Sequence, residues 1–79
     1  MSKGVSLVTV FSKNNCFPCK ITKEQLQKLG VPFVEERVDE NPSALEEIKK
    51  LGYLQVPVVV APSGEHWSGL QPDKIKALV

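Results

Sequence analysis

The chain's two cysteines, Cys16 and Cys19, are three positions apart. They follow an apolar run at 5–11 and precede a stretch with helical periodicity, so the pair is predicted to lie where a strand turns into a helix. The first turn of a helix has unpaired N–H groups and the positive end of the macrodipole, and both favour a thiolate over a thiol. Because the thiolate is the nucleophile in disulfide exchange, this placement predicts a redox-active dithiol.

The helix after the strand is expected at about 17–29, and its pattern assigns different environments to the two thiols. One of its faces carries residues at three- and four-residue steps: Cys19, Thr22, Leu26 and Leu29. We expect this face to pack on the sheet, with Phe17 and Ile21 pointing away from the core. Cys16 then lies at the exposed start of the helix. We therefore predict Cys16 as the nucleophile and Cys19 as the buried, resolving thiol.

Further periodic segments predict three more strands and two more helices. The strands are expected at 33–38, 56–61 and 65–68. The second helix begins after Asn41 and buries Ala44, Leu45, Ile48 and Leu51, and the last begins at Pro72 and buries Ile75, Leu78 and Val79. The resulting order is β-α-β-α-β-β-α. This order is that of a minimal thioredoxin fold, an α/β protein with a four-stranded mixed sheet.

Length and charge narrow the function classes. The 79 residues predict a single domain, 1–79, and we expect a monomer. A formal net charge of +1, from ten basic and nine acidic residues, gives no support for binding to nucleic acid or to an anionic membrane. The start of the chain shows neither a signal peptide nor a membrane span, so we expect a cytoplasmic protein, in a compartment where disulfides are usually transient and catalytic.

Three later segments resemble those of one family. They read Gly-Tyr-Leu-Gln-Val-Pro-Val-Val-Val at 52–60, His-Trp-Ser-Gly at 66–69 and Pro-Asp at 72–73. In combination with the cysteine pair they resemble the NrdH-redoxins, which are glutaredoxin-shaped proteins that behave like thioredoxins. The resemblance implies a disulfide reductase that thioredoxin reductase recharges and that donates electrons to the large-subunit disulfide of class Ib ribonucleotide reductase. It implies no cofactor and no metal beyond the Cys16–Cys19 disulfide.

The resemblance also assigns roles to individual residues. Cys16 is implied as the nucleophile, Cys19 as the resolving thiol and Pro57 as a cis-proline that faces them. The marker segment is Trp67, Ser68 and Gly69. We expect a partner peptide to pair with the backbone of Val56 and to lie on an apolar floor of Phe17, Val56 and Trp67. The chain departs from the family pattern at two places, and both bear on partner preference and reduction potential. Pro18 stands where the family usually has Gln, and Leu70-Gln71 stands where it has an aromatic and a basic residue.

Three other functions stay open. A glutathione-dependent dithiol glutaredoxin is disfavoured because Gln55 stands where glutaredoxins have Thr before Val-Pro. A non-enzymatic binding module, such as an iron–sulfur carrier, usually has a single cysteine, so Cys19 argues against it. A general thioredoxin is favoured by Pro18, yet the strand before the helix lacks a buried acid. A zinc site needs four ligands and the chain offers only His66 besides the cysteines, so we expect His66 to be an exposed strand residue.

Overall fold

A four-stranded mixed sheet forms the centre of the protein. The structure, a computed structural model, describes residues 7–79. Strand β1 (Val8–Ser12) runs parallel to β2 (Phe33–Arg37) and antiparallel to β3 (Val58–Val60), and β3 pairs antiparallel with β4 (His66–Ser68). The strand order is β2-β1-β3-β4, so β1 is a central strand, as its apolar run predicts. The expected order of elements and the thioredoxin fold are therefore confirmed.

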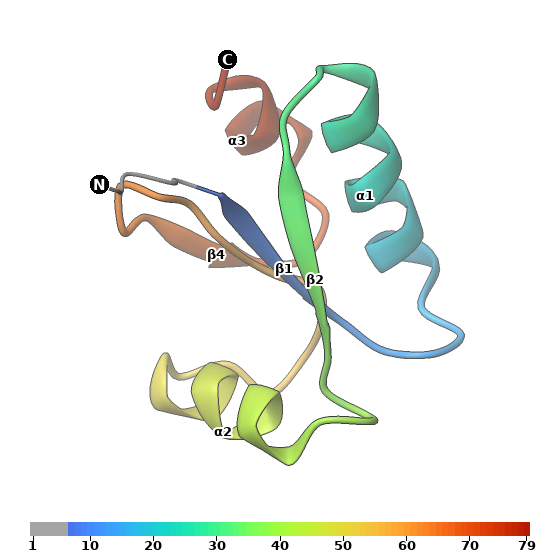
Figure 1. The fold of residues 1–79 in the computed structure, drawn as a ribbon, viewed down its shortest axis with the longest axis vertical. Helices are drawn as coiled ribbons and strands as arrows, with labels where there is room; N and C mark the ends of the chain where they lie inside the picture. Colours follow the sequence, from blue (N-terminus) through green and yellow to red (C-terminus); the bar gives the residue numbers. More distant parts are fainter. Residues whose placement is uncertain (1–6) are drawn as a thin grey trace.

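Three helices cover the two faces of this sheet. Helices α1 (Phe17–Lys28) and α3 (Pro72–Lys76) lie together on one face, and α2 (Pro42–Lys50) lies on the other (Figure 1). As predicted, Asn41 caps α2, and its side-chain oxygen accepts a hydrogen bond from the N–H of Ser43. No helix within residues 7–79 is long and apolar enough to cross a membrane.

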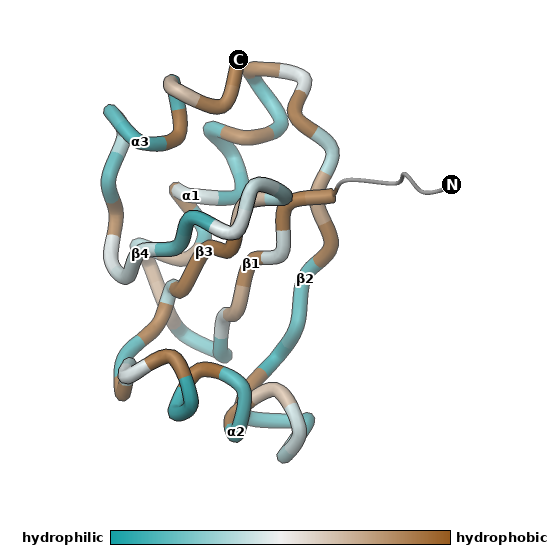
Figure 2. Tube along the Cα trace, turned by 90° about the vertical axis from the view of Figure 1, so that its left-hand side faces the viewer, coloured by the Kyte–Doolittle hydropathy of each residue, from teal (hydrophilic) through white to brown (hydrophobic). Residues whose placement is uncertain are grey.

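Strand alternation divides the core into two clusters, and Figure 2 shows the hydrophobic stretches of β1 and β3 between the helices. The cluster beneath α1 and α3 contains Val8, Val10, Leu26, Val59, Trp67 and Ile75. The cluster beneath α2 contains Phe11, Ala44, Ile48 and Val58. Neighbouring strand residues such as Val10 and Phe11 enter opposite clusters because successive side chains of a strand point to opposite faces.

Four boundary predictions need correction. Residues 5 and 6 of the first expected strand lie outside the described residues, and the described strand continues to Ser12. The second strand ends one residue early, at Arg37, the third spans Val58–Val60, and the fourth begins at His66. Leu29, Leu51 and Val79 were expected to be buried and are exposed. The chain turns back through Gly30, at a φ of 71°, and other residues fill the space against the core: Val31, Phe33 and Leu78.

Candidate active site

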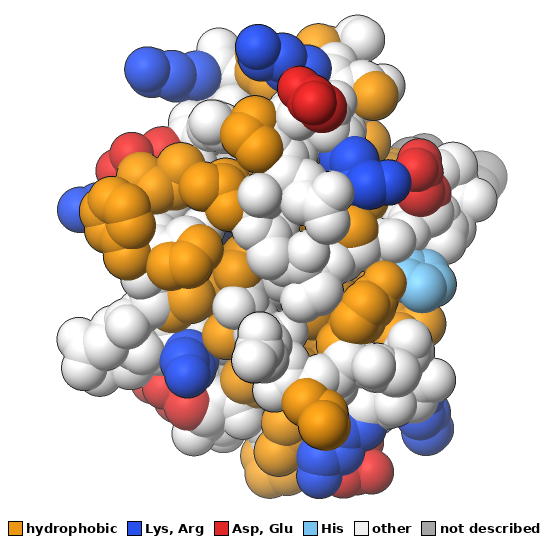
Figure 3. Space-filling view, turned by 180° about the vertical axis from the view of Figure 1, so that it is seen from behind, with side chains coloured by type: hydrophobic (Ala, Val, Ile, Leu, Met, Phe, Trp, Pro, Cys, Tyr) orange, Lys and Arg blue, Asp and Glu red, His pale blue; other side chains and the backbone are white. Residues whose placement is uncertain are grey.

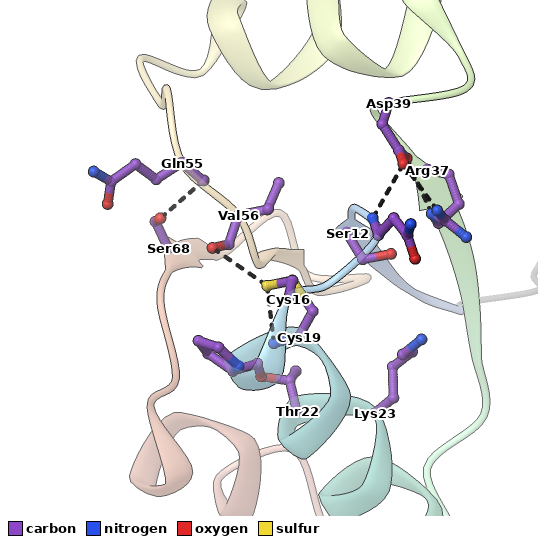
Figure 4. Close-up of a disulfide and its surroundings, with 12 residues drawn as sticks. Ser12, Cys16, Cys19, Thr22, Lys23, Arg37, Asp39, Gln55, Val56 and Ser68 are labelled. Carbon is purple, nitrogen blue, oxygen red and sulfur yellow. Dashed lines mark hydrogen bonds and ion pairs between the residues drawn. A yellow bond between two sulfur atoms is a disulfide. The ribbon is translucent and has the colours of Figure 1, made fainter.

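Cys16 and Cys19 form a disulfide at the start of α1, with their Cα atoms 5.3 Å apart (Figure 4). Cys16 is the N-cap residue of α1, and its Sγ accepts a hydrogen bond of 3.3 Å from the backbone N–H of Cys19. A sulfur atom thus takes the place of the usual N-cap oxygen. The same N–H points at Cys16 where a thiolate would form on reduction, and hydrogen bonding favours the charged form.

The two sulfur-bearing residues differ in exposure. Cys16 is half-buried, whereas Cys19 is 1 % exposed and lies beneath the first turn of α1. Between them, Phe17 and Pro18 are exposed, and Phe17 reaches 70 %. A partner can therefore reach Cys16 and Phe17 directly but can reach Cys19 only after a rearrangement. This is the asymmetry that the helical spacing predicts.

Side-chain hydrogen bonds fix the first turn of α1 and the loop before it. The buried hydroxyl of Thr22 donates to the carbonyl oxygen of Pro18 at 2.9 Å. In the loop, Asn15 has a φ of 58°, a conformation that Asn tolerates better than most residues. The backbone N–H of Asn14 donates to Asp39 Oδ2 at 3.1 Å. The loop that leads to Cys16 is thus tied to the end of β2.

Val56 and Pro57, which precede β3, face the disulfide from the side opposite the first turn of α1. The Val56–Pro57 peptide bond is cis, as the resemblance implied, and Pro57 is buried. The carbonyl oxygen of Val56 lies 4.0 Å from Cys16 Sγ (Figure 4). The N–H of Val56 donates no hydrogen bond to another described residue. Backbone groups of an exposed segment that lack partners are the groups that an extended peptide can pair with.

Strand β4 holds this segment through alternate residues. Ser68 Oγ donates to the carbonyl oxygen of Gln55 at 3.3 Å, and the hydroxyl of Tyr53 is hydrogen-bonded to His66 Nδ1 at 2.8 Å. The backbone N–H of Gly69 also donates to the carbonyl oxygen of Pro57 at 2.8 Å. His66 and Ser68 share a face because the side-chain period of a strand is two. His66 is exposed as expected, but sequence reasoning missed its link to Tyr53.

Trp67 does not form part of the partner floor, which corrects the prediction. Its side chain points to the opposite face from Ser68 and is 3 % exposed. It packs with Val10 and Val59 in the cluster beneath α1 and α3. The hairpin register places Trp67 opposite Val59. The alternation of side chains along a strand was the signal in the sequence that Trp67 and Ser68 face opposite sides of the sheet. The apolar surface beside the disulfide is left to the exposed Phe17 and Pro18 and the half-buried Val56.

A cleft of about 470 Å³ opens beside the disulfide towards β2. Its lining includes one carboxylate, Glu35, which accepts hydrogen bonds from the buried hydroxyl of Ser12 and from Lys23 Nζ, the latter at 2.8 Å. Burial raises the pKa of Glu35, but the hydrogen bonds from Lys23 and Ser12 outweigh it, so its pKa is lowered. Sequence reasoning missed this cluster. A serine at the end of an apolar strand was its one local signal.

A second ion pair lies at the end of β2. Arg37 donates to both carboxylate oxygens of Asp39, at 3.0 and 2.9 Å. The hydrogen bond from Arg37 holds the pKa of Asp39 below its ordinary value, and the Arg37 pKa is raised by the same contact. Among residues 7–79, no group of three His, Cys, Asp or Glu side chains is arranged to hold a metal ion.

Known proteins are similar to this chain both in sequence and in fold. The glutaredoxin family model matches residues 8–67. The glutaredoxin-like protein NrdH of Escherichia coli K12 is 37 % identical over 71 residues, which cover 90 % of this chain and 86 % of that protein. The NrdH protein of Lactococcus lactis subsp. cremoris is 35 % identical over 72 residues, covering 91 % of this chain and 99 % of that protein.

A solved structure is similar to this protein in fold as well as in sequence. The glutaredoxin-like NrdH-redoxin of Escherichia coli matches with a TM-score of 0.86 at 36 % identity, covering 91 % of this chain and 93 % of that one. Fold and sequence therefore agree over 90–91 % of this chain. The chain belongs to the glutaredoxin family, and within it to the glutaredoxin-like NrdH proteins.

Proposed function

We propose that this protein is a dithiol disulfide reductase that takes electrons from thioredoxin reductase and passes them to the large-subunit disulfide of class Ib ribonucleotide reductase. One observation carries the proposal. Cys16 lies half-buried at the N-cap of α1, where it accepts a hydrogen bond from Cys19, and Cys19 lies buried within bonding distance. This arrangement provides an accessible sulfur for attack and a protected sulfur for release.

The reaction exchanges two thiols for one disulfide. The Cys16 thiolate attacks one sulfur of the partner disulfide, and the other partner sulfur leaves as a thiolate and takes up a proton. Cys19 then loses its proton and attacks Cys16, which releases the second partner sulfur as a thiol. Two electrons pass to the partner, and the protein ends with the Cys16–Cys19 disulfide. A reductase reverses this step, so the proposal needs no cofactor beyond the cysteine pair.

The side of the disulfide formed by segments 51–57 and 67–72, called the loop side from here on, is proposed to receive the partner. An extended segment would pair with the N–H of Val56, which has no partner within the described residues, beside the Val56 carbonyl oxygen at 4.0 Å from Cys16 Sγ. Phe17, Pro18 and Val56 supply exposed or half-exposed apolar surface there, next to Pro57. Ser68 and Gly69 act indirectly, because their hydrogen bonds hold the segment of Gln55 and Pro57 in place.

The identity of the donor and acceptor rests on the family. The Escherichia coli NrdH-redoxin, 36 % identical to this chain, is a glutaredoxin-like protein with a thioredoxin-like activity profile. Gln55, in place of the threonine that glutaredoxins use to hold glutathione, also favours thioredoxin reductase over glutathione as the donor. We propose that the protein works as a monomeric single domain in the cytoplasm, where thiols are kept reduced.

A reductant-swap assay tests the proposal. Oxidised protein is supplied with NADPH and thioredoxin reductase, or with glutathione and glutathione reductase, and the reduction of a class Ib ribonucleotide reductase is followed by dNDP formation. We expect turnover with thioredoxin reductase and none with glutathione. Cys16→Ser is the control and should be inactive with both. Turnover with glutathione alone would instead establish a glutathione-dependent glutaredoxin.

A further inference from the structure

The two sides of the disulfide differ in the charge of the segments that form them. The cleft towards β2 is lined by four cations, Lys13, Lys20, Lys23 and Arg37, and by the carboxylate of Glu35. On the loop side, segments 51–57 and 67–72 contain no Asp, Glu, Lys or Arg. On the face seen from behind in Figure 3, hydrophobic and uncharged side chains fill much of the centre, while most Lys and Arg side chains lie near its rim.

Two of the four cations already have partners. Lys23 is paired with Glu35 at 2.8 Å, and Arg37 is paired with Asp39 at 2.9 Å. Lys13 and Lys20 are exposed and form no ion pair within residues 7–79. The cleft beside Cys16 therefore has two uncompensated positive charges. These charges are local, since the whole chain has a formal net charge of only +1.

We propose that Lys13 and Lys20 select partner segments that have acidic side chains beside the reducible disulfide. This inference rests on the proposed function, because it specifies the partner of the same site. An incoming segment that pairs with Val56 extends across Cys16 to the cleft that Lys13, Lys20 and the exposed Phe17 line. Charges at the rim of a binding surface chiefly raise the association rate, and salt screens them over about 8 Å at physiological ionic strength.

The ligand chemistry favours a protein segment over a small anion. The exposed Phe17 lines the cleft, and the backbone N–H of Val56, across Cys16, has no hydrogen-bond partner among residues 7–79; both features suit an extended peptide. Both lysines line the cleft beside Cys16, and Lys13 also lines a neighbouring pocket with Gln55 and Val56. A segment long enough to use both sides carries the disulfide in its middle. Acidic residues are then expected among its flanking positions.

Single-turnover kinetics on synthetic peptides test this inference. Three peptides share one intramolecular disulfide and differ only in the residues on both sides of it, which are Glu, Ser or Lys. Reduced protein in excess is mixed with each peptide, so no reductase is needed, and the reaction is quenched with acid and analysed by mass spectrometry. We expect the Glu peptide to react about threefold to tenfold faster than the Lys peptide at low salt, and the ratio to fall towards one in molar NaCl.

Charge reversal separates a local effect from a general one. Lys13→Glu combined with Lys20→Glu should invert the preference between the Glu and Lys peptides. The matched control is Lys28→Glu combined with Lys76→Glu, which changes the net charge equally at a pocket that contains neither cysteine. This control should keep the preference for the Glu peptide. The Ser peptide reports any change in the intrinsic reactivity of Cys16.

The outcomes distinguish the two proposals. Equal rates for the three peptides, or a preference that survives reversal of Lys13 and Lys20, would overturn the inference and leave the disulfide reductase in place. A preference that the control variant also loses would show an effect of net charge and would overturn it as well. If the reduced protein reduces none of the peptides, the proposed function fails and the inference fails with it.

Discussion

The helix side and the loop side of the disulfide are built in different ways. On the helix side, Cys16, its capping N–H and Cys19 come from four consecutive residues of the first turn of α1. On the loop side, Gln55 and Pro57, the two neighbours of Val56, accept hydrogen bonds from Ser68 in β4 and from Gly69 just after it. Reactivity therefore depends on a local segment, whereas the surface that meets a partner depends on segments brought together by the sheet.

This difference predicts different consequences for substitutions. A change on the helix side should alter the chemical steps, because it alters a reacting sulfur or its nearest donor. A change on the loop side should alter partner binding or stability, because residues there act through backbone position. Experiments that separate kcat from KM, and activity from the free energy of unfolding, can therefore tell the roles of the two sides apart.

The largest effect is expected for Cys19→Ser, which removes the resolving thiol. Cys16 should still attack a disulfide, but the mixed disulfide cannot resolve, so turnover stops after one equivalent and a stable adduct accumulates. Mass spectrometry under non-reducing conditions measures the adduct. The double variant with Cys16→Ser is the control and should form none. An adduct formed by Cys16→Ser alone would assign the nucleophile to Cys19 and would reverse the helix-side roles.

The next effect contrasts two aromatic residues. Trp67→Ala should lower the free energy of unfolding by about 3–5 kcal/mol, because Trp67 is buried among core residues. Phe17→Ala should change it by less than about 0.5 kcal/mol, because Phe17 is exposed, but should raise KM for protein disulfides. Urea denaturation of the oxidised proteins and steady-state kinetics measure both. A stable Trp67→Ala with raised KM would return Trp67 to the partner surface.

A smaller effect is expected for Ser68→Ala. The variant loses the hydrogen bond to the carbonyl oxygen of Gln55, at a cost of about 0.5–1.5 kcal/mol of stability. The segment with Val56 should then be less well positioned, so KM should rise more than kcat falls. Ser43→Ala, at an exposed position in the first turn of α2, is the matched control. If both variants bind partners equally well, the hydrogen bond from Ser68 does not position the loop side.

The smallest effect concerns Glu35 and pH. Its lowered pKa means that the folded protein favours the carboxylate, so Glu35 contributes stability above its pKa in the unfolded chain. That contribution is lost as pH falls through the folded pKa. Glu35→Gln should therefore cost about 0.2–1 kcal/mol at neutral pH and progressively less in acid. Urea denaturation at several pH values measures the difference, and Glu24→Gln, an exposed carboxylate on α1, is the control. A difference that grows in acid would contradict the assigned direction.

Much of the fold could be predicted from local pattern, and the errors have identifiable causes. The capping of α2 by Asn41 was predictable because a cap depends on adjacent residues. Leu29 was misplaced because helical periodicity does not show where a helix leaves the sheet. Trp67 was misplaced because a family marker was given precedence over the alternation of a three-residue strand. The Ser12–Glu35–Lys23 cluster was missed because its members come from three different elements.

A short stretch of sequence is enough to specify the reactive unit of this protein. Cys16, Cys19 and the start of a helix lie within a few residues, and their geometry follows from helix periodicity and from the unpaired N–H groups of a first turn. The residues that face this unit are set by how the strands pair in the folded protein. Pairing of β1 with β3, and of β3 with β4, brings Val56 to Cys16 and sends Trp67 into the core. Contacts between residues that are distant in the chain depend on strand register, which no short stretch of sequence encodes.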